Sequence, residues 1–274
     1  MQVNHHEDSN SSEANSVTGS DLRILVISLP GATVRQRLMH AQLDLPGMPP
    51  YTILDGINAR NFGPSELAAN YDDSAAREYL GRPVTLPEIG CGLSHLKACN
   101  HMVEHNIPIA LILEDDALIG HQFLKIIDRL VPKMTMSEPE IVLLTHVGRY
   151  SAWWPRKVDK IHYLFKPYSA FGAHGYLITL AAACALVRGL FPIHTFPDDW
   201  GNIQRSKMSR VSALVPYCIG TSILANSSQI GNERFNLDFR SKTKRLLRKY
   251  VYKKFLFQIF VKPALRLRKT ESTW

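Results

Sequence analysis

The sequence contains few cysteines, and they show no paired spacing. Its 274 residues include four, Cys91, Cys99, Cys184 and Cys218, and no two of them have the C-x-x-C spacing of metal-binding or redox motifs. Paired spacings are what zinc ribbons and small disulfide-rich domains require. We therefore expect neither a zinc site nor a disulfide framework, and the composition fits a reducing, cytoplasmic compartment.

Long apolar runs are absent too. No uninterrupted stretch reaches the roughly 18 apolar residues that a membrane-spanning helix needs. The first 20 residues are polar, rich in Ser, Asn and His, and they include no apolar signal region. We expect residues 1–21 to form a disordered extension, because so polar a segment cannot bury enough apolar surface to offset the entropy lost on ordering.

Three short motifs that mark large enzyme classes are missing from the chain. There is no G-x-G-x-x-G after the first apolar run, no G-x-x-x-x-G-K-[ST] and no G-x-S-x-G. Their absence argues against a dinucleotide-binding Rossmann site, a P-loop NTPase and the nucleophile elbow of α/β-hydrolases. The acidic and histidine residues are then the main candidates for chemistry.

The net charge of +8 comes from the C-terminal part of the chain. Residues 240–274 hold twelve Lys or Arg and one acid, whereas residues 1–21 hold acids and no Lys or Arg. The pI of about 9.3 therefore describes a tail, and the body of the chain is close to neutral. Basic clusters in the tail alternate with Tyr and Phe, which favours anionic membrane surfaces, at about 1 kcal/mol per basic residue. Nucleic-acid binding is the competing interpretation.

The rest of the chain alternates between short apolar runs and segments of helical periodicity. Such alternation predicts a layered α/β fold with a mostly parallel sheet. No repeat or long Gly/Ser linker divides it, so we expect one domain over residues 22–239 and a membrane-associating tail over residues 240–274. The predicted strands cover residues 23–29, 51–54, 109–113, 141–144, 176–178 and 211–215, and the predicted helices cover residues 33–43, 87–106, 121–130, 181–190 and a short segment from Asp198.

The apolar run Ile109–Leu113 ends abruptly in Glu114, Asp115 and Asp116. A buried strand that ends in acids places them at the edge of the sheet where ligands bind in open α/β folds. Alternation along the strand puts Glu114 and Asp116 on one face and Asp115 on the other. Two carboxylates on one face suit a hard divalent cation such as Mg²⁺ or Mn²⁺. The alternative is a strand that simply runs out into solvent.

The longest predicted helix has two glycines, Gly90 and Gly92, in its early turns. Each costs about 1 kcal/mol relative to alanine, so the pair indicates close approach of a ligand or of packed backbone. Glu88, Cys91 and His95 lie on one stripe of this helix. Tight helix–sheet packing and a ligand role for His95 both fit this pattern, and the sequence does not decide between them.

Other acids stand at the ends of predicted elements. Asp55 follows the strand over residues 51–54 and resembles the acid that binds a ribose hydroxyl in nucleotide-binding α/β folds. Asp198 is expected to cap the helix that follows it. Asp199, next to the large aromatic side chain of Trp200, is the candidate general base beside a sugar-binding surface.

In this order, the motifs resemble glycosyltransferase family 25, the bacterial enzymes of lipopolysaccharide and lipooligosaccharide synthesis. The most specific part of the resemblance is the Cys-x-x-Ser-His helix combined with the acidic strand end, and the whole covers residues 23–235. The matching segments are Val26–Leu29, Arg35, Asp55, Glu88–Leu96, Leu113–Asp116, Gly172–Ile178 and Asp199.

The resemblance implies a GT-A-like fold and a metal-dependent transfer of a hexose, often galactose, from a UDP-sugar to a glycolipid oligosaccharide, with inversion at the anomeric carbon. It implies that Asp116 and Glu114 hold Mn²⁺ or Mg²⁺ and that Asp199 deprotonates the acceptor hydroxyl. The substrate-binding set that it implies consists of Ser28, Arg35, Asp55, His95, Glu114, Gly175 and Tyr176.

Together with the basic tail, the resemblance predicts a peripheral enzyme on the inner face of a bacterial cytoplasmic membrane, with an anionic membrane surface and no nucleic acid among its partners. Two alternatives are a basic-tailed nucleic-acid-binding α/β protein and a Mg²⁺-dependent phosphotransfer domain. The second would need an acceptor aspartate after another strand, but the predicted strand over residues 141–144 is followed by Thr145 and His146.

Overall fold

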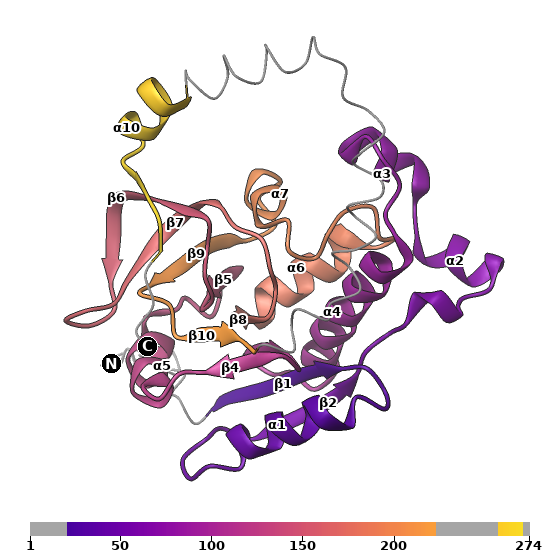
Figure 1. Ribbon diagram of the computed structural model, residues 1–274, viewed down its shortest axis with the longest axis horizontal. Helices are drawn as coiled ribbons and strands as arrows, with labels where there is room; N and C mark the ends of the chain where they lie inside the picture. The colour runs from indigo at the N-terminus through magenta and orange to yellow at the C-terminus, as the bar shows by residue number, and fades with distance from the viewer. Residues whose placement is uncertain (1–20, 223–256, 271–274) are drawn as a thin grey trace, which may run out of the picture.

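One nine-stranded sheet forms the centre of the fold (Figure 1). The computed structural model describes residues 21–222 and 257–270. The strands follow the order β11-β6-β7-β9-β5-β8-β3-β1-β2, and a separate pair joins β4 (Ala117–Ile119) to β10 (Ile219–Thr221). The strands of the large sheet are β1 (Leu22–Ser28), β2 (Tyr51–Asp55), β3 (Ile109–Glu114), β5 (Glu140–Leu143), β6 (Arg149–Lys157), β7 (Tyr163–Ser169), β8 (Gly175–Thr179), β9 (Arg210–Val215) and β11 (Leu267–Arg268).

The large sheet is mixed, but one strand direction dominates. β1 pairs in parallel with β2 and β3, and β5 pairs in parallel with β9. β8 lies antiparallel between β3 and β5, and β7, β6 and β11 alternate in direction beyond β9. Six of the nine strands, β1, β2, β3, β5, β6 and β9, therefore share one direction. This confirms the expected α/β fold with a mostly parallel sheet.

Helices cover both faces of this sheet. α4 and α6 lie side by side on one face, and α1 and α5 lie on the other (Figure 1). The helices are α1 (Thr33–Leu43), α2 (Pro64–Asn70), α3 (Asp73–Leu80), α4 (Leu86–Glu104), α5 (Phe123–Leu130), α6 (Leu180–Leu190), α7 (Trp200–Arg205) and α10 (Lys262–Ala264). Single turns of other helical types occur at Ala59–Asn61, Val131–Lys133 and Phe257–Val261.

The central strands supply alternate side chains to two separate apolar cores. Ala110 and Ile112 of β3 pack with α4 and α6, whereas Leu111 and Leu113 pack with α1 and α5. Because successive strand residues point to opposite faces, a strand buried on both sides must be apolar throughout. The run Ile109–Leu113 has this character, and all five side chains are fully buried. The run fixes β3 in the interior, so the acids that follow emerge at the sheet edge.

Most of the predicted elements agree with the structure to within a few residues. The helix expected over residues 33–43 matches α1 at both ends. The β6–β7 hairpin was not expected, and the short helix near Asp198 begins at Trp200, two residues later than predicted.

Parts of the terminal predictions cannot be compared with the fold. The expected disordered extension, apart from Asp21, and the tail, apart from residues 257–270, lie outside the described residues. Among residues 21–222 and 257–270, no helix combines the length and the apolar character needed to cross a bilayer.

Candidate functional site

A cavity of about 490 Å³ opens where β1 and β3 end. Its walls come from the β1–α1 loop, the turn that follows β2, the first half of α4 and residues 114–116. All three acids after the central strand contribute to the lining. Because β1, β2 and β3 run in parallel, their carboxyl ends meet at this edge, which is where open α/β sheets bind ligands.

Asp115 is the compensated member of the acidic triplet. Ser28 Oγ donates a hydrogen bond to its Oδ2 at 2.8 Å, and Arg35 Nη1 lies 3.0 Å from its Oδ1. Ser28 and Arg35 were expected beside the nucleotide. The structure shows that both hold Asp115 and that Arg35 also lines the cavity. Their place beside a nucleotide stays a prediction. The pair ties α1 to the end of β3 and fixes the geometry of the triplet.

Glu114 faces α4 rather than α1. His95 Nε2 lies 3.3 Å from Glu114 Oε1, and His95 Nδ1 lies 2.9 Å from the hydroxyl of Tyr176. Burial raises the pKa of Glu114, but the hydrogen bond from His95 and the nearby charges of His95, His174 and Arg35 outweigh it, so the pKa is lowered overall. Glu114 is therefore ionised, and His95 Nε2 carries the proton of this bond.

Asp116 is the uncompensated acid of the three. Its Oδ1 is buried and has no hydrogen-bond partner among the described residues. Burial, followed by the charge of Glu114, raises its pKa from 3.8 to about 6, against the opposing effect of Arg35. Buried carboxylate oxygens are normally hydrogen-bonded, so this oxygen remains able to accept a ligand. Glu114 and Asp116 both line the cavity. Two such carboxylates could hold a hard cation such as Mn²⁺ or Mg²⁺, and their role as metal ligands stays a prediction.

The start of α4 is held by an N-terminal capping box. Thr85 Oγ1 accepts a hydrogen bond from the backbone N–H of Glu88, and Glu88 Oε2 accepts one from the N–H of Thr85. Glu88 is fully buried and also forms an ion pair with Arg82 at 2.8 Å. Glu88 thus anchors the helix and does not line the cavity, unlike Cys91 and His95 one and two turns later.

The two glycines of α4 allow close packing. A Cβ on Gly90 would lie 2.4 Å from the backbone oxygen of Ile57, and one on Gly92 would lie 2.9 Å from the side chain of Ile193. Close packing against the Ile57 backbone and the Ile193 side chain therefore explains the glycines. Cys91 and His95 line the cavity, and a ligand role for His95 stays a prediction.

Packing α4 this closely brings three possible metal ligands together. Ligand atoms of Cys91, His95 and Glu114 all lie within 4.8 Å of one another. Positive charge comes from Arg35 and Arg60, which line the same cavity. Arg60 has no signal in the sequence, because it lies in the irregular stretch between β2 and α4, where no periodicity marks a functional side chain. Cys91 and His95 did have a signal, their i, i+4 spacing on one helix face.

The other expected site residues are not among those that line this cavity. Asp55 is exposed at the end of β2, and its backbone oxygen accepts a hydrogen bond from Lys97 Nζ at 2.8 Å. Gly175 starts β8, where a Cβ would lie 2.8 Å from Ile219. Tyr176 is fully buried and orients His95, so it contributes to the site through another side chain.

Asp199, and not Asp198, caps α7. Asp199 Oδ1 accepts from the backbone N–H of Asn202 at 2.9 Å, and its Oδ2 accepts from the hydroxyl of Tyr79 at 2.8 Å. Asp198 accepts from the N–H of Gly172 at 2.7 Å instead, which corrects the expectation that it caps the helix. The reason is that the chain turns into the helix one residue later than the position of the first acid suggested.

Comparisons with known proteins agree with the resemblance in the sequence. The profile of the family described as "Glycosyltransferase family 25 (LPS biosynthesis protein)" matches residues 21–200. Procollagen galactosyltransferase 1 of Danio rerio is 30% identical over 113 residues, which are 40% of this chain and 18% of that protein. Procollagen galactosyltransferase 2 of Homo sapiens is 30% identical over 125 residues, 44% of this chain and 19% of that protein. The chain spans about a fifth of the length of these curated relatives.

Among solved structures, a glycosyltransferase involved in the glycosylation of the major capsid of PBCV-1 aligns with 79% of this chain and 98% of its own, at 11% identity and a TM-score of 0.36. A similarity this low does not bear on function. The family profile, in contrast, extends over more than half of the chain, from the start of β1 to Trp200, and includes the cavity with its acidic triplet. On this match, the chain belongs to glycosyltransferase family 25.

Proposed function

We propose that the protein transfers a hexose from a UDP-sugar to a lipopolysaccharide or related glycolipid oligosaccharide, with inversion at the anomeric carbon and with the help of a divalent cation. The observation that carries this proposal is the buried Oδ1 of Asp116, which has no hydrogen-bond partner within residues 21–222 and 257–270 and lies beside Glu114 in the cavity of a family 25 chain. Galactose is the donor sugar we propose, because both curated relatives are named as galactosyltransferases.

The cavity has the charges that a sugar diphosphate requires. Arg35 and Arg60 would face the phosphate oxygens, since guanidinium groups bind phosphate through paired hydrogen bonds. Asp116 and Glu114 would hold Mn²⁺ or Mg²⁺, which in its bound state neutralises the charge that develops on the departing UDP. Ser28 contributes indirectly, because its hydrogen bond fixes Asp115 and with it the position of the neighbouring acids. Asp55 remains our candidate for the ribose hydroxyls.

Asp199 is the residue that we propose as general base for the acceptor hydroxyl. Its two hydrogen bonds, from Tyr79 and from the backbone of Asn202, leave each carboxylate oxygen with accepting capacity. Trp200, which follows it, lies with its ring 5.1 Å from that of Tyr176, the side chain that orients His95. General-base catalysis contributes about 10²- to 10⁴-fold to a rate. Asp199→Asn should lower kcat by this order and leave the affinity for UDP unchanged. If Asp198→Asn lowered kcat by the same factor, the effect of Asp199→Asn would indicate a structural role for Asp199 and not general-base catalysis.

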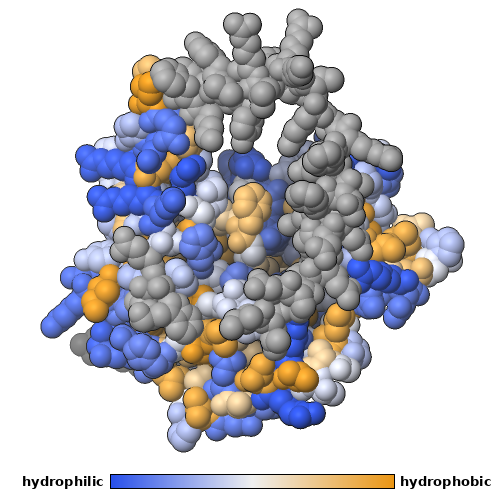
Figure 2. All heavy atoms as spheres, viewed as in Figure 1, coloured by the Kyte–Doolittle hydropathy of each residue, from blue (hydrophilic) through white to orange (hydrophobic). Residues whose placement is uncertain are grey.

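The described part of the tail supports membrane association. Residues 257–270 attach to the β6–β7 hairpin: β11 pairs with β6, and Trp153 Nε1 donates to the backbone oxygen of Ala264 at 2.9 Å. The neighbouring Trp154 is 89% exposed and Phe260 is 63% exposed. Figure 2 shows hydrophilic side chains gathered over β6 and α10, with hydrophobic ones at their upper end. We call this the basic-aromatic surface; its exposed members include Trp154, Lys157, Phe260, Lys262, Arg266, Arg268 and Lys269.

Aromatic side chains surrounded by Lys and Arg suit the interface of an anionic membrane. Vesicle sedimentation tests this part of the proposal. The protein should bind vesicles with anionic lipid and not neutral ones, and Trp154→Ser should weaken binding severalfold. Leu45→Ser is the matched control, because Leu45 is 59% exposed and lies outside the surface. Equal binding to neutral vesicles would contradict the charge argument.

The proposed activity is tested by ligand binding and by turnover. A ligand that prefers the folded state raises the melting temperature, so a panel of nucleotide sugars should show a shift with UDP-galactose that depends on Mn²⁺. UDP release in the presence of a lipooligosaccharide acceptor should stop in a chelator and resume when Mn²⁺ is restored. NMR of the product gives the anomeric configuration. If no UDP-sugar shifts the melting temperature under any metal condition, the proposed donor class is wrong.

A further inference from the structure

We propose that Cys91, His95 and Glu114 form a site for a transition metal of the Zn²⁺ class, distinct in chemistry from a hard-cation site at Asp116. Their ligand atoms lie within 4.8 Å of one another, and all three residues line the same cavity. The paired-cysteine pattern used to judge zinc sites from sequence does not cover such a set, because it combines one cysteine with a histidine and a carboxylate.

The backbone holds these ligands in place on two rigid elements. Cys91 and His95 are four residues apart on α4, so they project from consecutive turns of one helix face. Glu114 approaches them from the end of β3. The position of α4 is set by contact, since Gly90 leaves no room for a Cβ against the backbone of Ile57. Sites built on a helix and a strand are more precise than sites built on loops.

His95 has the outer hydrogen bond that metal-binding histidines have. Its Nδ1 lies 2.9 Å from the hydroxyl of Tyr176, which is itself fully buried against Trp200. On metal binding the proton of His95 would move from Nε2 to Nδ1, where the Tyr176 oxygen accepts it, and Nε2 would bind the metal. Cys91 would release its thiol proton to solvent. Such an outer partner fixes the tautomer and the ring orientation of the ligand.

The donor set indicates which metals this site accepts. Thiolate and imidazole ligands favour Zn²⁺ and Co²⁺, whereas Mg²⁺ requires oxygen ligands. Three protein ligands leave a fourth tetrahedral position, as in catalytic zinc sites, and here the cavity supplies the space for it. Glu114 is common to this site and to the cation pair with Asp116, so the two metals would compete for its carboxylate. Part of this inference therefore overlaps with the proposed function, and the test must separate them.

The test follows metal coordination without any sugar nucleotide. The full chain is stripped with a chelator and titrated with Co²⁺, because a cobalt–thiolate bond gives an intense near-ultraviolet charge-transfer band. We expect this band in the unmodified protein, with displacement of Co²⁺ by Zn²⁺ and not by Mg²⁺. Cys91→Ser should abolish the band, and His95→Gln should weaken Co²⁺ binding at least about tenfold. Cys184→Ser, at another partly buried cysteine, is the matched control and should keep the band.

Three results would overturn the inference: no band in the unmodified protein, a band that persists in Cys91→Ser, or a band that Cys184→Ser removes. Circular dichroism of each variant shows whether it is folded, and His95→Gln provides a second variant if Cys91→Ser does not fold. The proposed function can fail separately. A cobalt–thiolate band without sugar transfer would refute the transferase activity alone, and transfer with Mn²⁺ but no band would refute the transition-metal site alone.

Discussion

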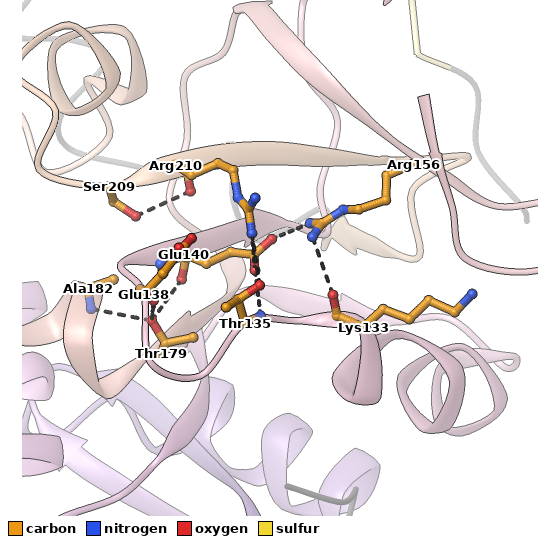
Figure 3. A network of polar contacts seen from close by, with 9 residues as sticks. All are labelled: Lys133, Thr135, Glu138, Glu140, Arg156, Thr179, Ala182, Ser209 and Arg210. Atoms are coloured by element: carbon orange, nitrogen blue, oxygen red, sulfur yellow. Dashed lines mark hydrogen bonds and ion pairs between the residues drawn. The ribbon is translucent and has the colours of Figure 1, made fainter. Parts of the chain in front are cut away.

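Two acids, Glu140 and Asp116, lie at the amino and the carboxyl edge of the parallel strands respectively, and the fold treats their carboxylates differently. Glu140 starts β5 and is completely buried, and each of its carboxylate oxygens has cationic or backbone partners (Figure 3). Arg156 pairs with Oε1, whereas Arg210 and the backbone N–H of Thr135 each lie 2.9 Å from Oε2. At the other edge, Asp116 keeps a buried oxygen without a partner among the described residues.

The difference separates an acid whose role is structural from the acid that we propose to be functional. A buried carboxylate costs free energy unless it is paired, so a network such as that of Glu140 is what stability alone demands. Asp116 departs from this rule at a place where a cavity, two arginines and a second carboxylate meet. The fold tolerates the unfavourable free energy of this carboxylate because buried side chains on both faces hold β3 in place. Uncompensated charge inside a cavity therefore indicates a binding role.

The largest expected effect follows from removing the charge of Asp116. Asp116→Asn should lower the transferase rate by about 10²- to 10³-fold, as is typical when one group that stabilises developing charge is lost. The same variant should melt at a higher temperature at pH 8. The folded pKa of about 6 lies above the ordinary 3.8, so ionisation destabilises the metal-free folded protein above this range. The gain should vanish below about pH 4, where the acid is protonated in both states.

Activity assays and melting curves in chelator measure both parts of this prediction. Asp128→Asn, an exposed acid of α5, is the matched control and should change neither quantity. A variant that turns over donor at the original rate would show that Asp116 has no role in transfer. A variant that melts at a lower temperature at pH 8 would show that the Asp116 carboxylate is compensated after all.

Glu140 should behave in the opposite way. Glu140→Gln removes the negative charge that Arg156 and Arg210 share, so the free energy of unfolding should fall by about 2 kcal/mol. The loss is limited because both arginine side chains are about a third to a half exposed and remain solvated without their partner. Activity per folded molecule should be unchanged. Urea denaturation gives the free energy of unfolding. If Glu140→Gln lost less stability than the exposed control Asp128→Asn, Glu140 would not be a stabilising acid and its contrast with Asp116 would disappear.

Sequence patterns predicted the parts of the fold that repeat a simple rule. The run Ile109–Leu113 and the helix over residues 33–43 follow the periods of buried strands and surface helices, so their bounds were close to those observed. β6 was not predicted because its alternation is interrupted: Trp154 has a φ of +46°, Pro155 follows, and the pairing with β7 shifts register between Ser151 and Arg156. A local kink of this kind removes the period on which a strand prediction rests.

The candidate site was only partly predictable, for a different physical reason. Glu114 and Asp116 could be identified as candidates because they stand at the end of an apolar strand. The approach of Cys91 and His95 to Glu114 depends on how closely α4 packs against the chain after β2, which tertiary contacts at Gly90 determine. The Asp115 pairing with Ser28 and Arg35 joins residues at least 80 positions apart in the chain, and no local pattern encodes it.

Ser28 provides an intermediate case between the two edges. Ser28→Ala removes one of the two hydrogen-bonded groups that hold Asp115, while the ion pair with Arg35 remains. We expect a stability loss of about 1 kcal/mol, the usual net value of one hydrogen bond. The rate should fall only severalfold, because Asp115 neighbours the proposed cation ligands without being one. Combined urea denaturation and UDP-release assays test this, and a rate loss as large as that of Asp116→Asn would place Asp115 among the ligands.

The smallest effect concerns Asp159, an acid in the β6–β7 turn that is compensated mainly by backbone. Burial raises its pKa, but hydrogen bonds from the N–H groups of His162 and Ile161 and from the His162 ring outweigh this and lower the pKa from 3.8 to about 2. A depressed pKa stabilises the fold above the ordinary value, and this contribution is lost as the pH falls from about 4 towards 2. The stability difference between unmodified protein and Asp159→Asn should therefore shrink over this range in urea denaturation. If Asp159→Asn were instead more stable than the unmodified protein near neutral pH, Asp159 would show the behaviour expected of Asp116, and pairing would no longer distinguish the two kinds of acid.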